Sequence, residues 1–484
     1  MMDEARVGRD TSLDPFDWTG LRALGHRMLD DLFDDWAAVR EGPVWRPMPE
    51  AVRAAWNEAL PREEAGPEAV YAAYRRLIAP YGVGNRHPRF FGWVHGAGTP
   101  VGMLAELLAA GLNANCGGRD HAPIAVERQV VRWAAEMLGL PADSSGLVVS
   151  GTSAANLIAV LVARAAALGS GVRAHGVGAA RLAAYASEGV HMCVARALDM
   201  AGLGSDALRR VRCDEAGRMD VMELRDRLEA DRAAGAVPFM VVGTAGSVDT
   251  GAVDDLAAIA ECCRIAAVWF HVDAAIGAPA MLSPGLRPLM AGVEQADSVG
   301  FDFHKLAQVQ YDAGCILVRD AAAHRTAFAR AASYLQSAER GLSAGDPWPV
   351  DLGPELSRGF RALKVWMTLK TYGADRLAAV VERCCDLAQR LAAAIRDAAE
   401  LELMAPVALN VVCFRVRGLG DQEQEEIAAD LQEAGSVVLS TTTIRGRRVL
   451  RAAIVNHRTA EEDVDAVVSE VCRVAWRRRT IGFL

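Results

Sequence analysis

Lysine is rare in this chain, and one of its three lysines lies where an amine nucleophile would be useful. Positive charge comes almost wholly from arginine, so Lys305, Lys364 and Lys370 each need an explanation. Lys364 and Lys370 lie in FRALKVWMTLKTYG, whose apolar spacing predicts an amphipathic helix, and a place on its solvated face is enough to explain both lysines. Lys305 lies between two apolar, strand-like runs, where a buried charge is costly unless it is paired or neutral. A lysine in such a site can lose its proton and attack an aldehyde.

Three further groups fall where an apolar run meets a loop, although each alone also has an ordinary structural explanation. Thr152 and Ser153 follow GLVVS and open a helix, so their backbone N–H groups suit a phosphate. Asp273 ends VWFHVD, where a buried carboxylate needs a cationic or protonated partner. His191 ends another short apolar run. Together with Lys305 they are the parts that hold pyridoxal phosphate: a Schiff-base lysine, a phosphate cradle, a carboxylate for the ring nitrogen and an imidazole to stack on the ring.

The elements that must position these groups follow from the hydrophobic pattern. From about 101 to 330, short apolar runs alternate with Ala-rich helical stretches, which predicts a mainly parallel sheet with helices on both faces and ligands at the carboxyl ends of its strands. The N-terminal region has helical periodicity, and the C-terminal region mixes strands and helices. We therefore expect a helical N-terminal arm for dimerisation at 1–100, a large cofactor-binding domain at 101–375 with a mobile loop at 332–357, and a small C-terminal α+β domain at 376–484.

Composition argues against several classes of function. The 484 residues carry 52 Lys+Arg and 61 Asp+Glu, a net charge of −9, which gives no electrostatic reason to bind nucleic acid or a membrane surface. The ten cysteines form no C-x-x-C pair and no His lies at metal-ligand spacing, so we expect no disulfide framework and no metal. The N-terminus lacks the basic region and apolar run of a secretory signal, which favours a cytoplasmic protein.

Five ordered sequence blocks resemble those of the pyridoxal-phosphate-dependent group II decarboxylases, the family of aromatic-L-amino-acid decarboxylase and glutamate decarboxylase. The blocks are HPRFFGWVHGAGTPVGMLAELL, HVDAA, ADSVGFDFHKLAQVQYDAGCILV, LSRGFRALKVWMTLKTYG and LRAAIVNHRTAEEDVD. The resemblance implies an α/β fold of PLP fold-type I (aspartate-aminotransferase-like) with a mainly parallel seven-stranded sheet, and a homodimer with active sites at the subunit interface. It also implies catalytic roles for His191, His304 and Lys305 and cofactor contacts at Thr152, Ser153, His191, Asp273, Ala275, Asp302, His304 and Lys305.

Several positions refine or depart from the family pattern. Tyr334 stands on the loop where the decarboxylases carry a tyrosine linked to protonation of the substrate carbon, and where related aldehyde-forming enzymes commonly carry phenylalanine. Asp302 replaces an asparagine near the phosphate, so its carboxylate must turn away or be paired, and Val248 replaces a cofactor-side threonine. The substrate-pocket positions, which predict a roomier and more polar pocket than that of the aromatic enzymes, are Trp93, His95, Asn115, Arg119 and His121.

These features predict decarboxylation of an L-amino acid to the amine and CO2, through a Schiff base at Lys305 and a proton returned by Tyr334. Two alternatives keep the same cofactor: decarboxylation coupled to oxidative deamination to an aldehyde, and carbon–sulfur β-elimination. A third is a non-catalytic relative, against which the retained Lys305, Asp273 and Tyr334 argue. The substrate is a small-molecule amino acid that the sequence does not identify further.

Overall fold

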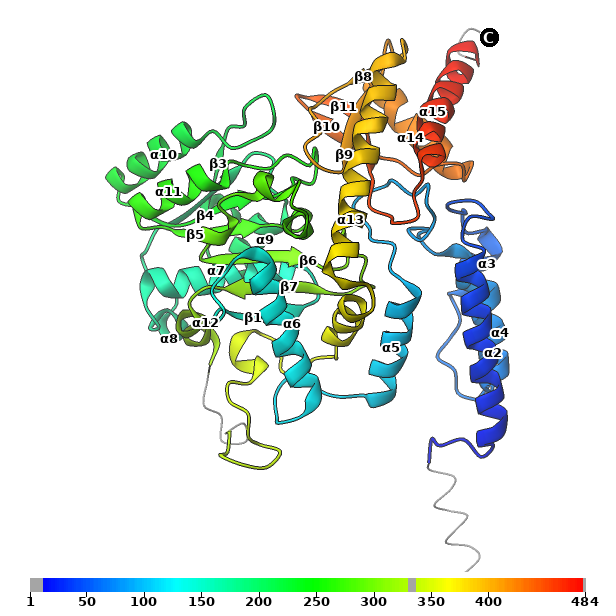
Figure 1. Cartoon of the computed structure of the whole chain (residues 1–484), viewed down its shortest axis with the longest axis horizontal. Helices are drawn as coiled ribbons and strands as arrows, with labels where there is room; N and C mark the ends of the chain where they lie inside the picture. Colours follow the sequence, from blue (N-terminus) through cyan, green and yellow to red (C-terminus); the bar gives the residue numbers. More distant parts are fainter. Residues whose placement is uncertain (1–11, 330–336, 482–484) are drawn as a thin grey trace, which may run out of the picture. The chain divides into compact units, whose positions relative to one another are not determined.

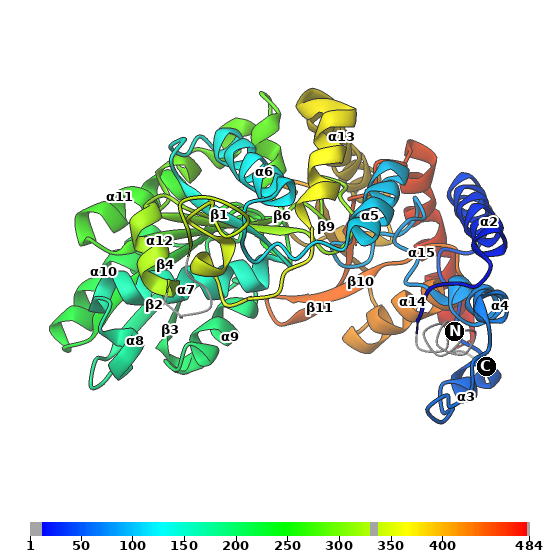
Figure 2. The same ribbon diagram turned by 90° about the horizontal axis from the view of Figure 1, so that it is seen from below.

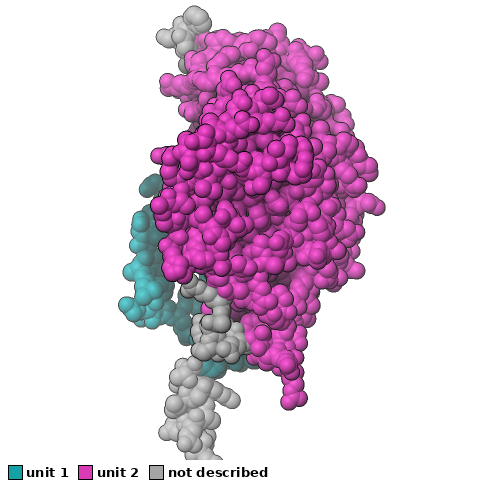
Figure 3. Space-filling view, turned by 90° about the vertical axis from the view of Figure 1, so that its left-hand side faces the viewer, with its two compact units in different colours: residues 1–84 teal, residues 85–484 magenta. Residues whose placement is uncertain are grey.

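The computed structural model describes residues 12–329 and 337–481. The chain divides into two compact units, residues 1–84 and residues 85–484, which Figure 3 colours separately. The helices of the first unit are α2 (Trp18–Ala37), α3 (Glu50–Ala55), α4 (Pro67–Leu77) and the 3-10 helix η1 (Ala79–Tyr81). The expected N-terminal helices are therefore present.

The second unit is built on a seven-stranded sheet with the order β1-β7-β6-β5-β4-β2-β3 (Figure 1). Five neighbouring strands, β6, β5, β4, β2 and β3, run parallel, whereas β7 is antiparallel to both β1 and β6. The expected mainly parallel, seven-stranded sheet is confirmed, and its parallel strands bring their carboxyl ends to one edge. The strands are β1 (Ser145–Val149), β2 (Leu182–Ser187), β3 (Leu208–Val211), β4 (Val237–Thr244), β5 (Trp269–Asp273), β6 (Ser298–Asp302) and β7 (Gly314–Val318).

Helices cover both faces of this sheet, because its strands direct apolar side chains to both faces. In β2, Leu182 and Ala184 pack into the cluster that contains α7, whereas Ala183 and Tyr185 pack into the cluster that contains α6 and α11. Figure 2 shows α7 and α9 on one side of the strands and α6 and α11 on the other. The bounds are α6 (Ala122–Leu138), α7 (Thr152–Leu168), α8 (Val172–His175), α9 (Cys193–Met200), α10 (Val221–Ala233), α11 (Leu256–Ala266) and α12 (Ala321–Phe328). Short 3-10 helices are η2 (Ser205–Ala207), η3 (Ala278–Leu282), η4 (Arg287–Met290), η5 (Val293–Gln295) and η6 (Pro349–Leu352).

A close approach between α7 and the sheet depends on Gly300. A Cβ at this position of β6 would lie 3.0 Å from Asn156 Oδ1 and 3.1 Å from the Ala155 side chain. A larger residue would therefore push the first turns of α7 away from the strand. This contact fixes the start of α7 beside the carboxyl end of β6.

A second sheet, of four antiparallel strands in the order β10-β11-β9-β8, belongs to the same unit. The chain near Phe91 joins this sheet, because the N–H of Phe91 donates to Val438 (2.8 Å) and its carbonyl accepts from Ala453 (2.8 Å). The elements here are α5 (Pro100–Leu112), α13 (Ala362–Asp397), β8 (Leu401–Leu403), β9 (Val411–Val416), α14 (Asp421–Glu433), β10 (Ser440–Ile444), β11 (Arg447–Ala453) and α15 (Glu461–Ile481).

The expected domain boundaries at residues 100 and 375 stay predictions. Residue 375 falls within α13, two residues after Gly373, whose φ of 76° interrupts the helical geometry. Among the helices of the described residues, none combines the length and apolar character needed to cross a membrane. The described residues also contain no cluster of three or more His, Cys, Asp or Glu side chains arranged to hold a metal.

Candidate active site

A cavity of about 470 Å³ lies at the carboxyl ends of β4, β5 and β6. This is the edge at which a parallel α/β sheet places its ligand. The fold brings together side chains that the sequence spreads from residue 93 to residue 451. The predicted site residues that line this cavity are Trp93, His95, Thr152, Ser153, His191, Asp273, Ala275, Asp302, His304 and Lys305.

The lysine in this cavity is paired with the unexpected carboxylate. Lys305 Nζ lies 2.8 Å from Asp302 Oδ2, and the other oxygen of Asp302 accepts the backbone N–H of Thr152 (2.7 Å). Asp302 is 3% exposed, so this carboxylate is almost completely withdrawn from water. Its charge is thus balanced by Lys305 and by the N-terminal end of α7.

A second buried carboxylate, Asp273, lacks such a partner. Its Oδ2 accepts a hydrogen bond from Asn156 Nδ2 (2.9 Å), and its Oδ1 accepts the backbone N–H of Ala275 (3.1 Å). No cationic side chain forms an ion pair with it in the part of the chain that the structure describes. A carboxylate in this state can accept a proton-bearing, positively charged group of a ligand.

Asp273 stands at the end of a chain of hydrogen bonds between buried side chains. Because Asn156 donates to Asp273, its Oδ1 must accept, and it does so from His271 Nε2 (2.9 Å). His271 Nδ1 then accepts from Ser298 Oγ (2.8 Å), which itself accepts from Trp269 Nε1 (2.8 Å). Burial lowers the pKa of His271 to about 3, so the ring stays neutral and keeps this tautomer. Every donor in the chain points toward Asp273, which polarises the chain in favour of the carboxylate.

Two histidines complete the wall with defined tautomers. His191 Nδ1 accepts the N–H of Cys193 (3.2 Å), and His304 Nδ1 accepts the N–H of Ala313 (3.0 Å). Burial lowers the pKa of His191 and of His304, and nearby carboxylates only partly oppose this effect. Both imidazoles are therefore neutral near pH 7, and each carries its proton on Nε2.

Unsatisfied polar atoms identify the groups that a ligand must satisfy. The hydroxyls of Thr152 and Thr244 and the Nδ1 atom of His95 are buried and have no hydrogen-bond partner among the described residues. All three side chains line the cavity. Buried polar groups are seldom left unpaired, so this cavity is suited to a polar ligand that can form hydrogen bonds with these hydroxyl and imidazole groups.

Comparison with known proteins identifies the family. The model of the pyridoxal-dependent decarboxylase conserved domain matches residues 49–417. The chain belongs to the pyridoxal-dependent decarboxylases. It is 30% identical to an aromatic-L-amino-acid decarboxylase of Bacillus atrophaeus over 470 residues, which cover 94% of this chain and 95% of that protein. It is 28% identical over 477 residues to a phenylacetaldehyde synthase of Arabidopsis thaliana, with 94% and 96% of the two chains covered.

A solved structure agrees with this assignment. The crystal structure of Oryza sativa TDC with PLP and tryptamine has a TM-score of 0.87 and 25% identity, and the match covers 96% of this chain and all of that one. This pyridoxal-dependent decarboxylase is thus a carboxy-lyase with the fold-type I architecture, and its cofactor is pyridoxal phosphate. The residues in the cavity fit this cofactor, because Lys305, Asp273 and the start of α7 match its aldehyde, ring nitrogen and phosphate, and Asp273 has no ion-pair partner among the described residues.

Some predicted residues lie elsewhere. Asn115, Arg119 and His121 do not line the cavity of their own chain. Asn115 Oδ1 accepts the N–H of Gly117 (2.9 Å), and the Arg119 guanidinium stacks on Trp348, 4.5 Å from the ring centroid. Tyr334 lies outside the described residues.

Lys364 does not lie on a solvated face, so the simple explanation of this lysine does not hold. Its side chain is buried, and its ammonium pairs with Glu106 at 2.6 Å. An amphipathic pattern identifies the apolar face of a helix but does not show which polar residue meets a carboxylate of another helix. Lys370 is exposed, as expected.

Several residues of the cavity wall were not singled out from the sequence, among them Thr244, Tyr311 and Arg451. Tyr311 packs on the His304 imidazole, with 4.2 Å between ring centroids. Arg451 is 3% exposed, and its Nη1 donates to Ser440 Oγ (3.2 Å). The signal for Arg451 was available, since a single cation stands in the apolar run VLRAAIV. Tyr311 gave no comparable signal, because an aromatic residue in a loop is common.

Proposed function

We propose that this enzyme removes CO2 from an L-amino acid and releases the amine. One observation supports this proposal most strongly: Lys305 and the buried carboxylate of Asp273, which lacks an ion-pair partner in the described chain, line the same cavity. Lys305 would anchor the cofactor covalently, and Asp273 would keep its ring nitrogen protonated. When bound, pyridoxal phosphate supplies an electron sink for the electron pair left behind by CO2.

Other residues of the wall would orient the reactants. The neutral imidazole of His191 would stack on the cofactor ring, and the phosphate would lie at the backbone N–H groups of Thr152 and Ser153. His304 would donate its Nε2–H to a phosphate or substrate oxygen. These groups would hold the scissile Cα–carboxylate bond in a single orientation and limit the entry of water.

The proton that replaces CO2 on Cα would come from Tyr334, as the family pattern implies. A second phenol, that of Tyr311, lines the cavity, and burial raises its pKa, so it stays protonated at neutral pH. Both tyrosines are thus candidates for the final proton transfer, and the sequence resemblance favours Tyr334.

Matched variants test the role of Tyr334. Tyr334→Phe should still bind substrate and release CO2, but amine should fall while aldehyde, ammonia and peroxide rise, because the carbanion then persists long enough to react with oxygen. Tyr311→Phe, the control, should keep the wild-type ratio of amine to aldehyde. Quantifying all products and CO2 from a panel of amino acids separates these outcomes. If Tyr311→Phe changes the ratio and Tyr334→Phe does not, the assignment is reversed.

A second candidate function is the oxidative route to an aldehyde. It is supported by the similarity to a phenylacetaldehyde synthase and by Val248, which lines the cavity where the family has a hydroxyl. Aldehyde and peroxide as the main products of the wild-type enzyme would establish this route. Pyruvate from a sulfur amino acid would instead indicate β-elimination, and complete absence of products would indicate a non-catalytic relative.

We further propose that a second copy of the chain completes the site and that the enzyme is cytoplasmic. Asn115, Arg119 and His121 follow α5, whose exposed face carries Leu107, Leu108 and Leu112, each more than half exposed. An apolar row of this kind favours burial against a partner. Mixing inactive Lys305→Ala with inactive Arg119→Ala chains should restore activity, because each mixed dimer holds one site with both residues. No restoration, or a monomeric mass, would contradict the shared site; cell fractionation tests the location.

A further inference from the structure

A separate cavity of about 280 Å³ lies at the edge of the seven-stranded sheet, where residues of α6, β1, α12 and η6 meet (Figure 1). It shares no lining residue with the candidate active site. Much of its wall is apolar and is formed by Ile124, Val131, Leu147, Pro347, Pro349 and Leu352. The cavity can therefore hold the apolar body of a small molecule.

The polar side of this cavity carries positive charge that the chain does not balance. Arg128 and Arg132 lie one turn apart on α6, are exposed, and form no ion pair with a carboxylate of the described residues. Glu127 also lines the cavity, but its Oε1 lies 2.6 Å from Nη2 of Arg358, which balances its charge. Among the described residues of the lining, Asp143 is the other carboxylate. Two guanidinium groups beside one such carboxylate favour a ligand with a single negative charge.

Two hydrogen-bond donors lie in the same wall. Ser144 is 8% exposed, and its hydroxyl has no partner among the described residues. The second donor is a backbone N–H of the edge strand β1. The N–H of Val148 leaves the sheet and donates to Glu127 Oε1 (3.0 Å). Residues two apart in a strand direct their backbone groups to the same side, so the N–H of Gly146 faces this open edge as well. Carboxylate oxygens accept from all of these donors.

We propose that this cavity is a second ligand site, which binds a small monocarboxylate with a compact apolar body. The carboxylate accepts hydrogen bonds from Arg128, Arg132 and the Ser144 hydroxyl, and the apolar body packs against Leu147 and Pro349. The site lies outside the candidate active site, so the inference goes beyond the proposed function and does not depend on which product the enzyme releases.

Arg128 connects this site to the segment that follows the predicted mobile loop. Its Nη2 donates to the carbonyls of Gly345 (2.6 Å) and Pro347 (2.8 Å), which uses both protons of that nitrogen. The protons on Nη1 and Nε remain for a carboxylate. A bound carboxylate therefore holds Arg128 in place without releasing residues 345–347. The backbone amides of residues 348–352, which include η6, should then exchange their hydrogens more slowly.

The test compares two probes on the full-length enzyme loaded with pyridoxal phosphate. Benzoate carries the proposed charge and apolar body, and benzamide has the same shape without the charge. Calorimetry should show saturable binding of benzoate and binding of benzamide at least about tenfold weaker, as expected for the loss of a charge-assisted hydrogen bond. Hydrogen exchange followed by mass spectrometry should show slower exchange in residues 348–352 with benzoate alone.

Matched arginine variants locate the bound probe. Arg132→Gln keeps the length of the side chain, removes its charge, and should weaken benzoate binding by about tenfold. Arg396→Gln is the control, because Arg396 is an exposed arginine near the end of α13, has no ion pair among the described residues and does not line the cavity. It should leave the affinity for benzoate unchanged. Benzoate bound in the candidate active site would be indifferent to both substitutions.

Serine variants give a second, independent measurement. Ser144→Ala removes a hydroxyl that lacks a partner, so it should raise the unfolding temperature of the enzyme without benzoate and also weaken benzoate binding. Ser145→Ala is the control, because the Ser145 hydroxyl donates to His324 Nδ1 (2.8 Å), and its loss should lower the unfolding temperature.

Three results would overturn the inference: equal affinity for benzoate and benzamide, wild-type affinity for benzoate in both Arg132→Gln and Ser144→Ala, or unchanged exchange of residues 348–352. None of these measurements uses the decarboxylation products. Absence of benzoate binding together with normal amine production would therefore remove the second site and leave the proposed function standing. Benzoate binding that depends on Arg132, in an enzyme that releases no amine, would do the reverse.

Discussion

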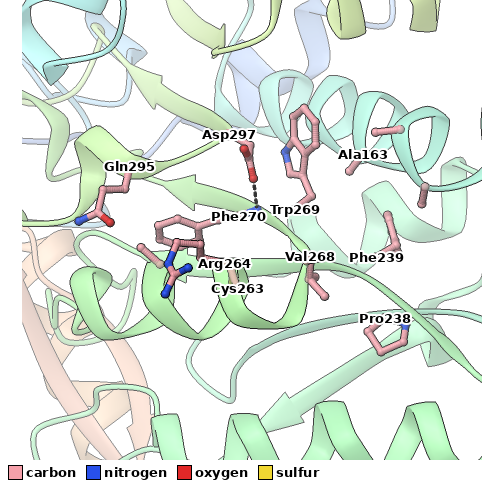
Figure 4. Close-up of a pocket in the computed structure, with 14 residues that line it drawn as sticks. Ala163, Pro238, Phe239, Cys263, Arg264, Val268, Trp269, Phe270, Gln295 and Asp297 are labelled. Atoms are coloured by element: carbon pink, nitrogen blue, oxygen red, sulfur yellow. Dashed lines mark hydrogen bonds between the residues drawn. The ribbon is translucent and has the colours of Figure 1, made fainter.

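The same three strands, β4, β5 and β6, have a cavity at each end. The cavity at their carboxyl ends measures about 470 Å³, and the one at their amino ends, shown in Figure 4, about 440 Å³. Each contains a carboxylate that accepts a backbone N–H at 2.7 Å: Asp302 from Thr152 in the first, and Asp297 from Phe270 in the second. Neither volume nor the presence of a hydrogen-bonded aspartate therefore distinguishes the two cavities.

The two cavities differ in what is left unsatisfied. At the carboxyl ends, Lys305 faces the cavity and two threonine hydroxyls lack partners, whereas no unpaired buried side-chain atom found in the described ranges lines the amino-end cavity. There, Arg264 pairs with Glu261 (2.6 Å), and Trp269 Nε1 donates to Ser298. Unsatisfied polar groups and a lysine side chain, not volume, distinguish the cavity at the carboxyl ends and make it the candidate active site.

Of the changes at the two cavities, replacement of Lys305 should cause the largest loss of turnover. Lys305→Ala should abolish covalent attachment of the cofactor and lower turnover by several orders of magnitude, while noncovalent binding persists through phosphate and ring contacts. Absorbance of the bound cofactor and CO2 release measure both effects. Lys370→Ala, at an exposed lysine, is the control and should behave like the wild type. Borohydride labelling of Lys364 or Lys370 in the wild type would contradict the assignment.

Two aspartate variants compare the ends directly. Asp273→Asn should keep cofactor binding measurable but lower turnover by several orders of magnitude, because a neutral ring nitrogen no longer draws electrons from Cα. Asp297→Asn retains an oxygen for the N–H of Phe270 and should leave turnover near the wild-type value. Steady-state kinetics with matched cofactor occupancy measures both. Equal losses in the two variants would mean that Asp273 is only a structural carboxylate.

The hydrogen-bond chain from Trp269 to Asp273 connects the cavity at the amino ends of the strands with the cavity at their carboxyl ends. The loss of turnover caused by a substitution in this chain should therefore decrease with distance from Asp273. Asn156→Ala removes a direct donor to Asp273 and should lower turnover by about ten- to a hundredfold, as loss of groups that orient a functional ligand commonly does. Ser298→Ala should cost less, and Trp269→Phe least. The cofactor absorbance should shift in the same order. A loss of turnover in Trp269→Phe equal to that in Asn156→Ala would show that the effect does not decrease with distance from Asp273.

The smallest effect concerns stability at the amino ends. Burial raises the pKa of Asp297 above its ordinary value of 3.8, so the folded chain holds this proton more tightly than the unfolded chain. The resulting stabilisation is complete below pH 3.8 and is lost as the pH rises through the raised pKa of the folded state. Asparagine does not titrate, so Asp297→Asn should lack this loss. Urea unfolding across the acidic range measures the difference, and identical pH profiles for both proteins would exclude the effect.

Much of the fold and of the candidate site was predictable, because both follow from local patterns. Alternating strands and helices imply a parallel sheet, and residues such as Asp273 that end apolar strands must gather at its carboxyl edge. Pairing was less predictable, because it depends on which elements meet in space. The sequence required Asp302 to turn away or be paired but did not identify Lys305 as its partner, and the burial of Lys364 against Glu106 was missed. The polar chain under Asp273 was also missed, since His271 looks like an isolated polar residue in a strand.

The first turn of α7 has a consequence for changes in chain length. Thr152 serves the Asp302 end of the cavity and Asn156 serves the Asp273 end, four residues apart and therefore about 6 Å along the helix axis. Backbone hydrogen bonds fix this rise, so substitutions leave the spacing unchanged. One inserted residue between them would rotate Asn156 by about 100° and detach it from Asp273. Insertions and deletions beyond Leu168 should therefore leave the site intact. Insertions and deletions within residues 152–156 should disrupt the site, even at positions where single substitutions are accepted.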